Sequence, residues 1–454
     1  MAIIATCTFN LNEDLDDYHD SKFDKLECII NNEIYKQFKN IDKFLDLDNC
    51  KLSKLPKLNY GLIKLNISNN NLKELPELPH TLEELNCSFN QLTVLPILPK
   101  NLIELDCCFN QLTELPELPQ SLNALDCNNN NLTKLPILPH TLEELNCSNN
   151  PLLTQLPNLP SILQKLDCSN NPLLTQLPDL PSNLKGLDCS NNSSLTQLPE
   201  LPHNLEILDC SNNIKLTELP ELPKQLKYLD CSNNIILSKL PKLPHNLDIL
   251  ICSHNDILTK LPKLPNRLKK LNCSYNDILS ELPILPKKIK ELDCSFCILT
   301  VLPILPKNLI DLDCSNCKLY KLPELPHNLE ILDCYNNNLL TELPKLPNTI
   351  IELDCSNCNI DKLPELPNTI IELDCNENNL SKLPKLPKNL IDLDCNNNDN
   401  LLSLPLSIIK CNKLDDYILY NHLNYIENLA YLINIAIENY YYKPIIDYYN
   451  KCLL

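Results

Sequence analysis

The chain has 454 residues and a formal net charge of −19, with only 2 glycines beside 37 prolines and 25 cysteines. So few glycines exclude the phosphate-cradling loops and the GxSxG elbow of common enzymes. The acidic balance argues against nucleic acid, which is bound by neutralising its phosphates, and the lack of an apolar run of about 18 residues argues against a membrane span.

Residues 1–40 are predicted to form an N-terminal helical cap. Phe23, Leu26, Ile30 and Ile34 recur at helical spacing, and a capping-box-like SKFD begins at Ser21. A cap of this kind covers the open end of a repeat array. The alternative is that this segment docks a second partner, as an adaptor would when it recruits another complex such as a ubiquitin ligase.

Residues 41–411 are built from a repeat of 20 or 21 residues, which predicts 19 coils of a solenoid. One unit, residues 81–100, reads TLEELNCSFNQLTVLPILPK. Leu85 and Cys87 lie two apart and share the buried face of a short strand, so Asn86 faces the other way. The prolines of LPILP make the returning side extended. One unit cannot bury its own core, but stacked units can.

Asparagine is expected to replace glycine in the turns of this array. It tolerates the left-handed backbone region, whereas the two glycines, Gly61 and Gly186, are incidental. Asn90, three residues after the cysteine, lies where its amide can bond neighbouring backbone as the chain turns. The extra residue of the 21-residue units follows this asparagine and is expected in a loop.

The pattern LxxLxCxxNxLxxLPxLPxx resembles the short bacterial-type leucine-rich repeat of the YopM and IpaH effectors, with cysteine at an apolar position of the repeat. The resemblance implies a β-rich solenoid: a curved horseshoe with a parallel concave sheet, an extended convex side and short helical caps. It also implies an effector-like protein that binds other proteins. The IpaH branch adds a large ligase domain, which residues 412–454 are too few to form, so the repeat-only YopM branch is the closer analogue.

Residues 412–454 are predicted to form a C-terminal helical cap. Leu419, Leu423, Ile426 and Ala430 make one apolar face before Pro444 interrupts the pattern. No catalytic motif is found in this segment or in the repeats, so the sequence predicts a non-enzymatic protein without a cofactor.

Most cysteines occupy two positions of the repeat, the strand position and the asparagine position. Equivalent residues of adjacent coils stack about 4.8 Å apart, whereas bonded cysteines prefer Cβ atoms about 3.8 Å apart. Free, buried thiols are therefore expected, which favours a reducing, cytoplasmic location. Cys294, Cys297, Cys314 and Cys317 match a zinc-ribbon spacing, but the coil period alone accounts for that spacing, so no metal site is predicted.

The residue between the strand leucine and the strand cysteine is aspartate in thirteen coils, here called the aspartate column: Asp46, Asp106, Asp126, Asp167, Asp188, Asp209, Asp230, Asp293, Asp313, Asp333, Asp354, Asp374 and Asp394. Stacked at about 5 Å, such charges repel by about 1 kcal/mol each even in water. The column is either a hydrated face that keeps the protein soluble, or a surface for a basic partner or for cations.

Ile251 interrupts this column, and Ile207, Tyr228 and Ile249 are expected beside it, with His254 and Tyr275 just beyond the strand ends. An apolar and aromatic cluster of this kind is typical of a binding hot spot, although repeat drift also explains it. We therefore predict that a protein partner, a basic one, binds the concave face. The predicted contacts are these six residues and the C-terminal aspartates Asp293, Asp313, Asp333, Asp354, Asp374 and Asp394.

Overall fold

The computed structural model describes residues 43–55, 57–58 and 61–401, which fall into two compact units divided after Leu258. Both predicted caps and residues 402–411, the end of the predicted repeat array, lie outside the described residues. Within the described part, no helix is long and apolar enough to cross a membrane.

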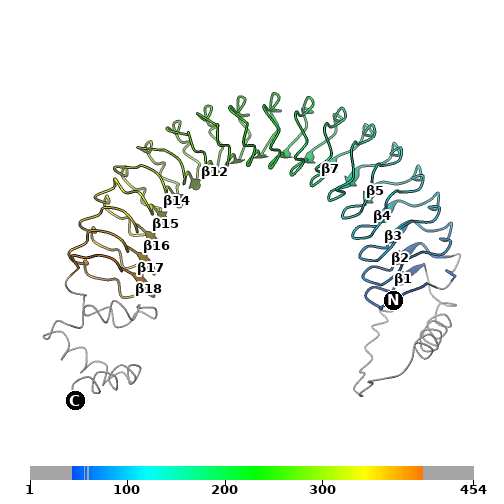
Figure 1. Ribbon diagram of the computed structural model, residues 1–454, viewed down its shortest axis with the longest axis horizontal. Helices are drawn as coiled ribbons and strands as arrows, with labels where there is room; N and C mark the ends of the chain where they lie inside the picture. Colours follow the sequence, from blue (N-terminus) through cyan, green and yellow to red (C-terminus); the bar gives the residue numbers. More distant parts are fainter. Residues whose placement is uncertain (1–42, 56, 59–60, 402–454) are drawn as a thin grey trace, which may run out of the picture. The chain divides into compact units, whose positions relative to one another are not determined.

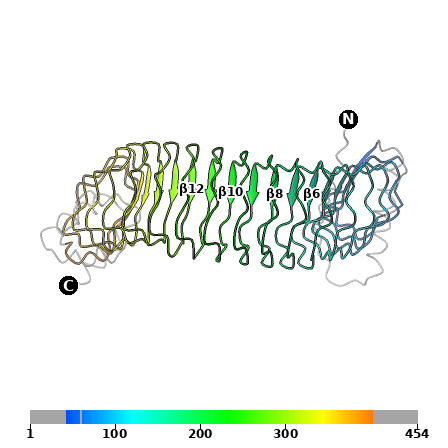
Figure 2. The same cartoon turned by 90° about the horizontal axis from the view of Figure 1, so that it is seen from above.

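Unit 1 contains eleven described strands of three residues each. They are β1 (Phe44–Asp46), β2 (Lys64–Asn66), β3 (Glu84–Asn86), β4 (Glu104–Asp106), β5 (Ala124–Asp126), β6 (Glu144–Asn146), β7 (Lys165–Asp167), β8 (Gly186–Asp188), β9 (Ile207–Asp209), β10 (Tyr228–Asp230) and β11 (Ile249–Ile251). Each strand pairs in parallel with the strand of the next coil. Figure 2 shows β6, β8 and β10 in this parallel row.

Unit 2 contains seven described strands of the same length. They are β12 (Lys270–Asn272), β13 (Glu291–Asp293), β14 (Asp311–Asp313), β15 (Ile331–Asp333), β16 (Glu352–Asp354), β17 (Glu372–Asp374) and β18 (Asp392–Asp394). These also pair in parallel with the next coil. Within each unit the strands line the inner side of the curve and the proline-rich segments form the outer side (Figure 1), which confirms the predicted parallel solenoid.

The core of each coil consists of the apolar positions that the repeat predicts. In the coil of β3, Leu82, Cys87 and Leu92 have no exposed surface, and Leu85 is 2% exposed. The register sets Leu65, Leu85 and Leu105 side by side, so each leucine packs on its equivalents in the neighbouring coils. Burying one such side chain contributes about 1.5–3 kcal/mol.

The predicted asparagine amide links neighbouring coils. Asn90 Nδ2 donates to the carbonyl oxygens of Cys87 and Ser88 in its own coil and of Ile67 in the preceding coil, while its Oδ1 accepts from Leu72 N at 3.0 Å. Buried carbonyls without such partners are costly. In a 21-residue coil, Asn171 Oδ1 accepts instead from Asn150 N at 2.9 Å, because the extra residue enlarges the adjoining loop as predicted.

The turn after each described strand contains a residue in the left-handed region, most often asparagine, for example Asn129 with φ 51° and Asn191 with φ 57°. Neither glycine has a positive φ. Asparagine therefore takes the role that glycine plays in most proteins, as the sequence predicts.

Candidate functional site

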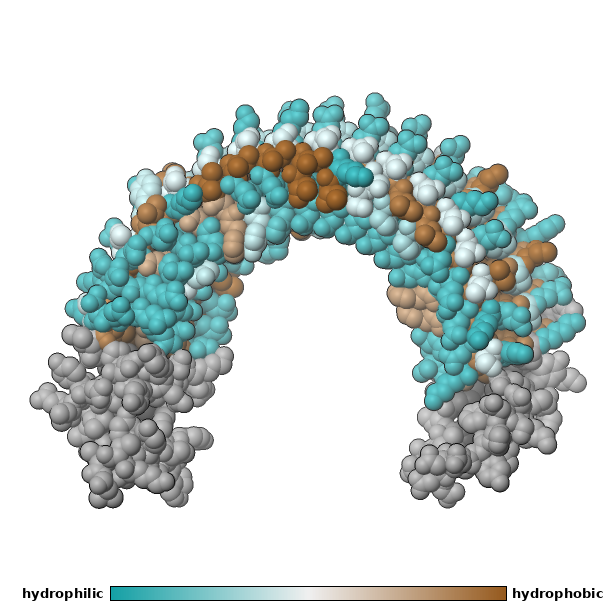
Figure 3. Space-filling view, viewed as in Figure 1, coloured by the Kyte–Doolittle hydropathy of each residue, from teal (hydrophilic) through white to brown (hydrophobic). Residues whose placement is uncertain are grey.

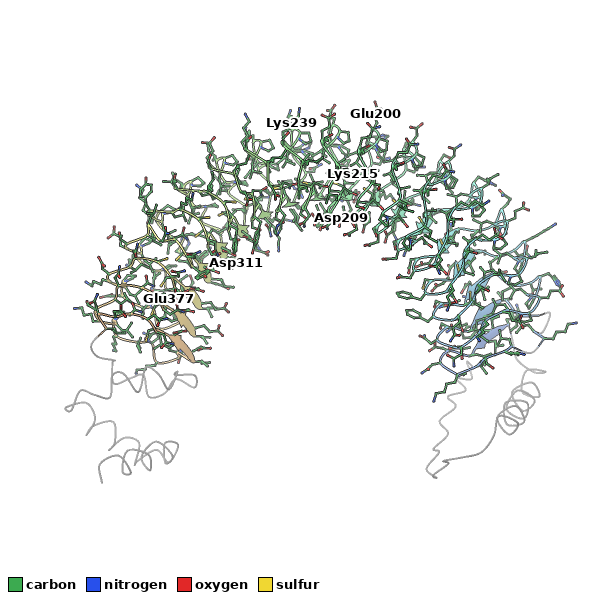
Figure 4. The ribbon with its side chains drawn as sticks, in the orientation of Figure 1. Glu200, Asp209, Lys215, Lys239, Asp311 and Glu377 are labelled. Carbon is green, nitrogen blue, oxygen red and sulfur yellow. The ribbon has the colours of Figure 1, made fainter. Side chains whose placement is uncertain are left out.

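The concave face of unit 1 forms an open groove with a volume of about 830 Å³. Its charged lining consists of eight carboxylates and two lysines: Glu84, Glu104, Asp106, Asp126, Glu144, Asp167, Asp188, Asp209, Lys64 and Lys165. Eight less two leaves an excess of six negative charges. In Figure 4, Asp209 lies on this inner side, whereas Glu200 and Lys239 lie on the outer side.

Both lysines of the groove already pair with a carboxylate of an adjacent coil. Lys64 Nζ lies 2.5 Å from Glu84 Oε1, and Lys165 Nζ lies 2.6 Å from Glu144 Oε1. These ion pairs are solvent-exposed and contribute little to stability. They leave the field of the groove negative, which favours an approaching cation.

Each aspartate of the column is a hydrogen-bond acceptor within its own turn. Asp209 Oδ1 accepts from Ser211 N at 3.0 Å and from Ser211 Oγ at 2.7 Å. Where the coil has asparagine instead, the geometry is the same, since Asn86 Oδ1 accepts from Ser88 N at 3.0 Å and from its Oγ at 2.7 Å. Aspartate and asparagine at this position therefore both supply the turn with an acceptor, which Ile251 does not, and this structural role is one that sequence reasoning missed.

These hydrogen bonds do not remove the electrostatic cost of the column. Burial, followed by the charges of Asp313 and Asp354, raises the pKa of Asp333 to about 7. Burial and the two neighbouring aspartates likewise raise the pKa of Asp374 to about 6. Burial is thus the main cost of ionising these two carboxylates, and repulsion by the neighbouring aspartates adds to it.

The six predicted aspartates of unit 2 lie in one row. The register pairs Asp293 with Asp313, and the row continues to Asp394 at β18. A second row beside it is also mainly acidic and includes Asp311, on the inner side of the sheet in Figure 4. Lys270 Nζ lies 2.7 Å from Glu291 Oε2 at the start of this row.

The predicted apolar cluster forms across β9, β10 and β11. Ile207, Tyr228 and Ile249 are register neighbours, and Ile251 follows Asp209 and Asp230 in the next row. Ile207 is 53% exposed, whereas the other three are half-buried. Burial, followed by the charges of Asp230 and Asp209, raises the pKa of Tyr228 to about 12, so its hydroxyl stays a donor among carboxylates.

His254 and Tyr275 occupy the left-handed turn position, with φ 52° and 53°. Tyr275 stacks on Phe296 in unit 2, with ring centroids 4.0 Å apart. In unit 1, Phe89 stacks on Phe109 at 4.2 Å. Sequence reasoning missed Phe89, Phe109 and Phe296. Each lies two residues after a strand cysteine, and aligning this position across the repeats shows that aromatic residues replace asparagine there.

An aromatic residue is an unfavourable choice for this backbone position. The left-handed conformation costs about 1–2 kcal/mol for an ordinary residue, and asparagine avoids part of that cost. A stacked aromatic pair recovers about 0.5–1.5 kcal/mol. Since Phe89 and Phe109 are still 46% and 43% exposed, the fold alone does not account for them.

A second exposed apolar surface follows the extra residues of the 21-residue coils. Figure 3 shows it as a brown patch on one lateral face, and in unit 1 it contains Ile214, Ile235, Ile236 and Ile257 after β9 to β11. In the sequence, this surface is indicated by the apolar residues that precede the loop leucine in these 21-residue coils.

The cysteines of the zinc-like spacing are hydrogen-bond donors to backbone. Cys294 Sγ donates to Asp313 O and Cys317 Sγ to Cys294 O, at 3.5 and 3.3 Å. Burial raises the pKa of Cys317 to about 11 and that of Cys297 to about 12. Burial therefore favours the protonated form of these thiols.

In the described part of the chain, one group of three side chains brings possible metal ligands together. The ligand atoms of Asp106, Cys108 and Asp126 lie within 4.8 Å of one another. Burial and the Asp106 carboxylate both raise the pKa of Cys108, and Cys108 occupies the position of the turn serine. The group therefore resembles the other turns of the column, with a thiol in place of a hydroxyl.

Comparison with known proteins agrees with the geometry. The Leucine Rich Repeat family model matches residues 141–161 and 162–184. YopM from Yersinia enterocolitica is 40% identical, with a TM-score of 0.73 over 82% of this chain and 86% of that one. A YopM structure from Yersinia pestis is 34% identical over 78% and 88%, with a TM-score of 0.49. No curated protein sequence matches.

Proposed function

The chain belongs to the YopM-like family of leucine-rich repeat proteins, and on this premise we propose that it is a non-enzymatic scaffold whose acidic concave face binds a basic protein partner. The family resemblance supports a protein ligand. The alternative, an adaptor whose N-terminal helix recruits a second complex, concerns residues outside the described part.

The observation that carries the proposal is the charge of the unit 1 groove, whose eight carboxylates face two lysines that are already paired. Complementary charge sets the rate and the specificity of association. The aspartate row of unit 2 extends the same chemistry. The same negative charge repels nucleic acid and anionic membrane surfaces.

We further propose a reducing, cytoplasmic location. The strand cysteines are free and buried, as at Cys168, Cys189 and Cys210. Burial holds the pKa of each of these thiols well above its usual range, so they act as small core residues. Proteins of reducing compartments keep such thiols unbonded.

Charge removal tests the acidic face. The partner is isolated by affinity capture and identified by mass spectrometry, and its affinity for the purified protein is then measured at several salt concentrations. Asp167→Asn, Asp188→Asn and Asp209→Asn together keep the turn acceptors but remove three charges. We expect at least about tenfold weaker binding and a shallower dependence on salt.

The matched control removes three charges from the convex side, where Glu117, Glu200 and Glu221 are exposed at equivalent positions. Changing all three to glutamine alters the net charge equally and should leave the affinity within about twofold. Equal effects of the two triple variants would show that only net charge matters, and would contradict binding at the concave face.

The apolar cluster is proposed as the hot spot of the same interface. Tyr228→Ala with Ile251→Asp removes the aromatic surface and places a charge beside Asp230. We expect loss of partner capture with an unchanged circular dichroism spectrum, because buried aromatic anchors carry most of the energy of an interface. If the variant captured the partner as well as wild type does, the cluster would be a neutral variation of the repeat and not a binding site.

A further inference from the structure

The stacked pair Phe89–Phe109 is the least expected feature of unit 1, because asparagine takes this turn position in most other coils. The backbone of both residues is in the left-handed region, with φ values of 52° and 50°. They stack nearly parallel, with an interplanar angle of 10°, and nearly half of each side chain is exposed. The pair thus presents a flat aromatic surface to solvent at the end of β3 and β4.

The turn of Phe109 also contains a carboxylate of the groove. Asp106 lies three residues before Phe109, and its Oδ1 accepts from Cys108 N at 3.1 Å. Phe89 N donates in turn to the carbonyl oxygen of Cys108 at 3.0 Å. Carboxylate oxygens of Asp106 and Asp126 lie within the 4.8 Å group around Cys108. The two carboxylates therefore stand in adjacent coils, at the ends of β4 and β5, and the aromatic pair lies in the turns after β3 and β4.

We propose that Phe89, Phe109, Asp106 and Asp126 form a recognition site for an arginine side chain of the basic partner. The inference rests on the proposed function and adds to it the residue type that the partner presents. A guanidinium group is planar, stacks on an aromatic face and donates two parallel hydrogen bonds to a carboxylate. A lysine ammonium satisfies the charge but not the stacking, because it is compact and strongly hydrated.

A nucleobase is another planar group that stacks on aromatic residues. The charge of the surroundings distinguishes it from arginine as the ligand of this site. Bases are accompanied by phosphates and are bound in positively charged grooves. Here Glu84, Glu104 and the two aspartates line the groove on β3, β4 and β5, and the aromatic pair follows β3 and β4. The cation of a protein side chain fits this surface, whereas the phosphates of a nucleic acid are repelled by it.

A similar arrangement recurs in unit 2. Tyr275 and Phe296 stack with an interplanar angle of 9°, and Asp293 lies three residues before Phe296, as Asp106 does before Phe109. Lys270, paired with Glu291, stands in the same coil as Tyr275. The coil of Phe89 has Glu84 at the strand position that Lys270 takes in the coil of Tyr275, so the site of unit 1 is the more acidic one and is tested first.

The test compares two synthetic peptides of equal charge, one with five arginines and one with five lysines, each alternating with serine. Their binding is measured by fluorescence anisotropy at fixed ionic strength. Wild type should bind the arginine peptide about three- to fivefold more tightly than the lysine peptide. Phe89→Asn with Phe109→Asn installs the usual residue of this turn. The variant should bind both peptides equally, with a thermal midpoint at or above that of wild type.

The control is Ile97→Asn with Ile137→Asn, which removes two apolar side chains that are 90% and 86% exposed on the proline-rich side. It should keep the arginine preference. If wild type shows no preference for arginine, or if the Phe variant keeps the preference, the arginine site is overturned. In either case, salt-dependent binding of both peptides still supports the acidic concave face. Binding of neither peptide overturns both proposals, and binding of a thymidine decamer that the Phe variant loses would assign the pair to nucleobases.

Discussion

At the scale of the residue, the aspartate column combines two demands that conflict. Aspartate supplies the turn with an acceptor, as Asp333 does for Tyr335 N at 2.9 Å, and asparagine would supply one without charge. The sequence shows the charge of such a position but not its hydrogen bond. For this reason the column could be predicted as a row, whereas its structural role could not.

Asp333→Asn tests how much the charge costs. The native pKa of Asp333, about 7, lies above the ordinary value of 3.8. Between these values the folded state holds a proton that the unfolded state has lost, so stability falls as pH rises through this window. We expect the variant to be more stable than wild type by about 1 kcal/mol at pH 8 and equal to it at pH 4.

Urea denaturation at both pH values measures this difference. Asp361→Asn, at an exposed position outside the column, serves as the control and should change stability by less than about 0.5 kcal/mol at either pH. If Asp333→Asn destabilised the protein equally at pH 4 and pH 8, the carboxylate would be needed for more than its acceptor oxygen.

At the scale of the element, the asparagine amide shows what a short strand cannot do alone. Three-residue strands leave many carbonyls in the adjoining turn, and Asn192 Nδ2 donates to those of Cys168 and Cys189 while its Oδ1 accepts from Asn171 N. The sequence predicted this contact, because the asparagine recurs three residues after the cysteine. It did not predict which turn residues stack, since stacking depends on the neighbouring coil.

Asn192→Leu and Asn192→Cys should destabilise unit 1 to different extents. Leucine removes one of the two amide donors of the Cys168 and Cys189 carbonyls, which keep Asn171 Nδ2 and Asn213 Nδ2 as partners. It also leaves the Asn171 N–H without its acceptor, and should cost about 1–3 kcal/mol. Cysteine retains one weak donor, as Cys317 does toward Cys294 O, and should cost less. Chemical denaturation gives the order, and the reverse exchange Cys317→Asn should stabilise unit 2. A larger loss for cysteine than for leucine would show that side-chain volume, rather than hydrogen bonding, governs this position.

At the scale of the whole molecule, periodicity made the fold predictable. Apolar positions that recur every 20 or 21 residues specify one coil, and the coil specifies its neighbour, so the parallel solenoid follows from the sequence. The candidate site follows only in part. The aspartate column and the apolar cluster were predictable because equivalent positions of the repeat align on the strands. The aromatic pairs and the lateral apolar patch lie in the turns and loops, where the coils depart from the common repeat.

This periodic construction predicts that one whole coil can be removed. Deleting residues 171–191 joins Asn170 to Asn192 and restores the sequence DCSNN of a complete coil. Because each coil contacts only its two neighbours, the shortened chain should keep its circular dichroism spectrum per residue and lose only a few degrees of thermal midpoint. Deleting residues 171–180 removes half a coil, moves every later leucine out of the core row and should abolish cooperative unfolding. Similar midpoints for the two deletions would mean that register between coils does not hold the solenoid together.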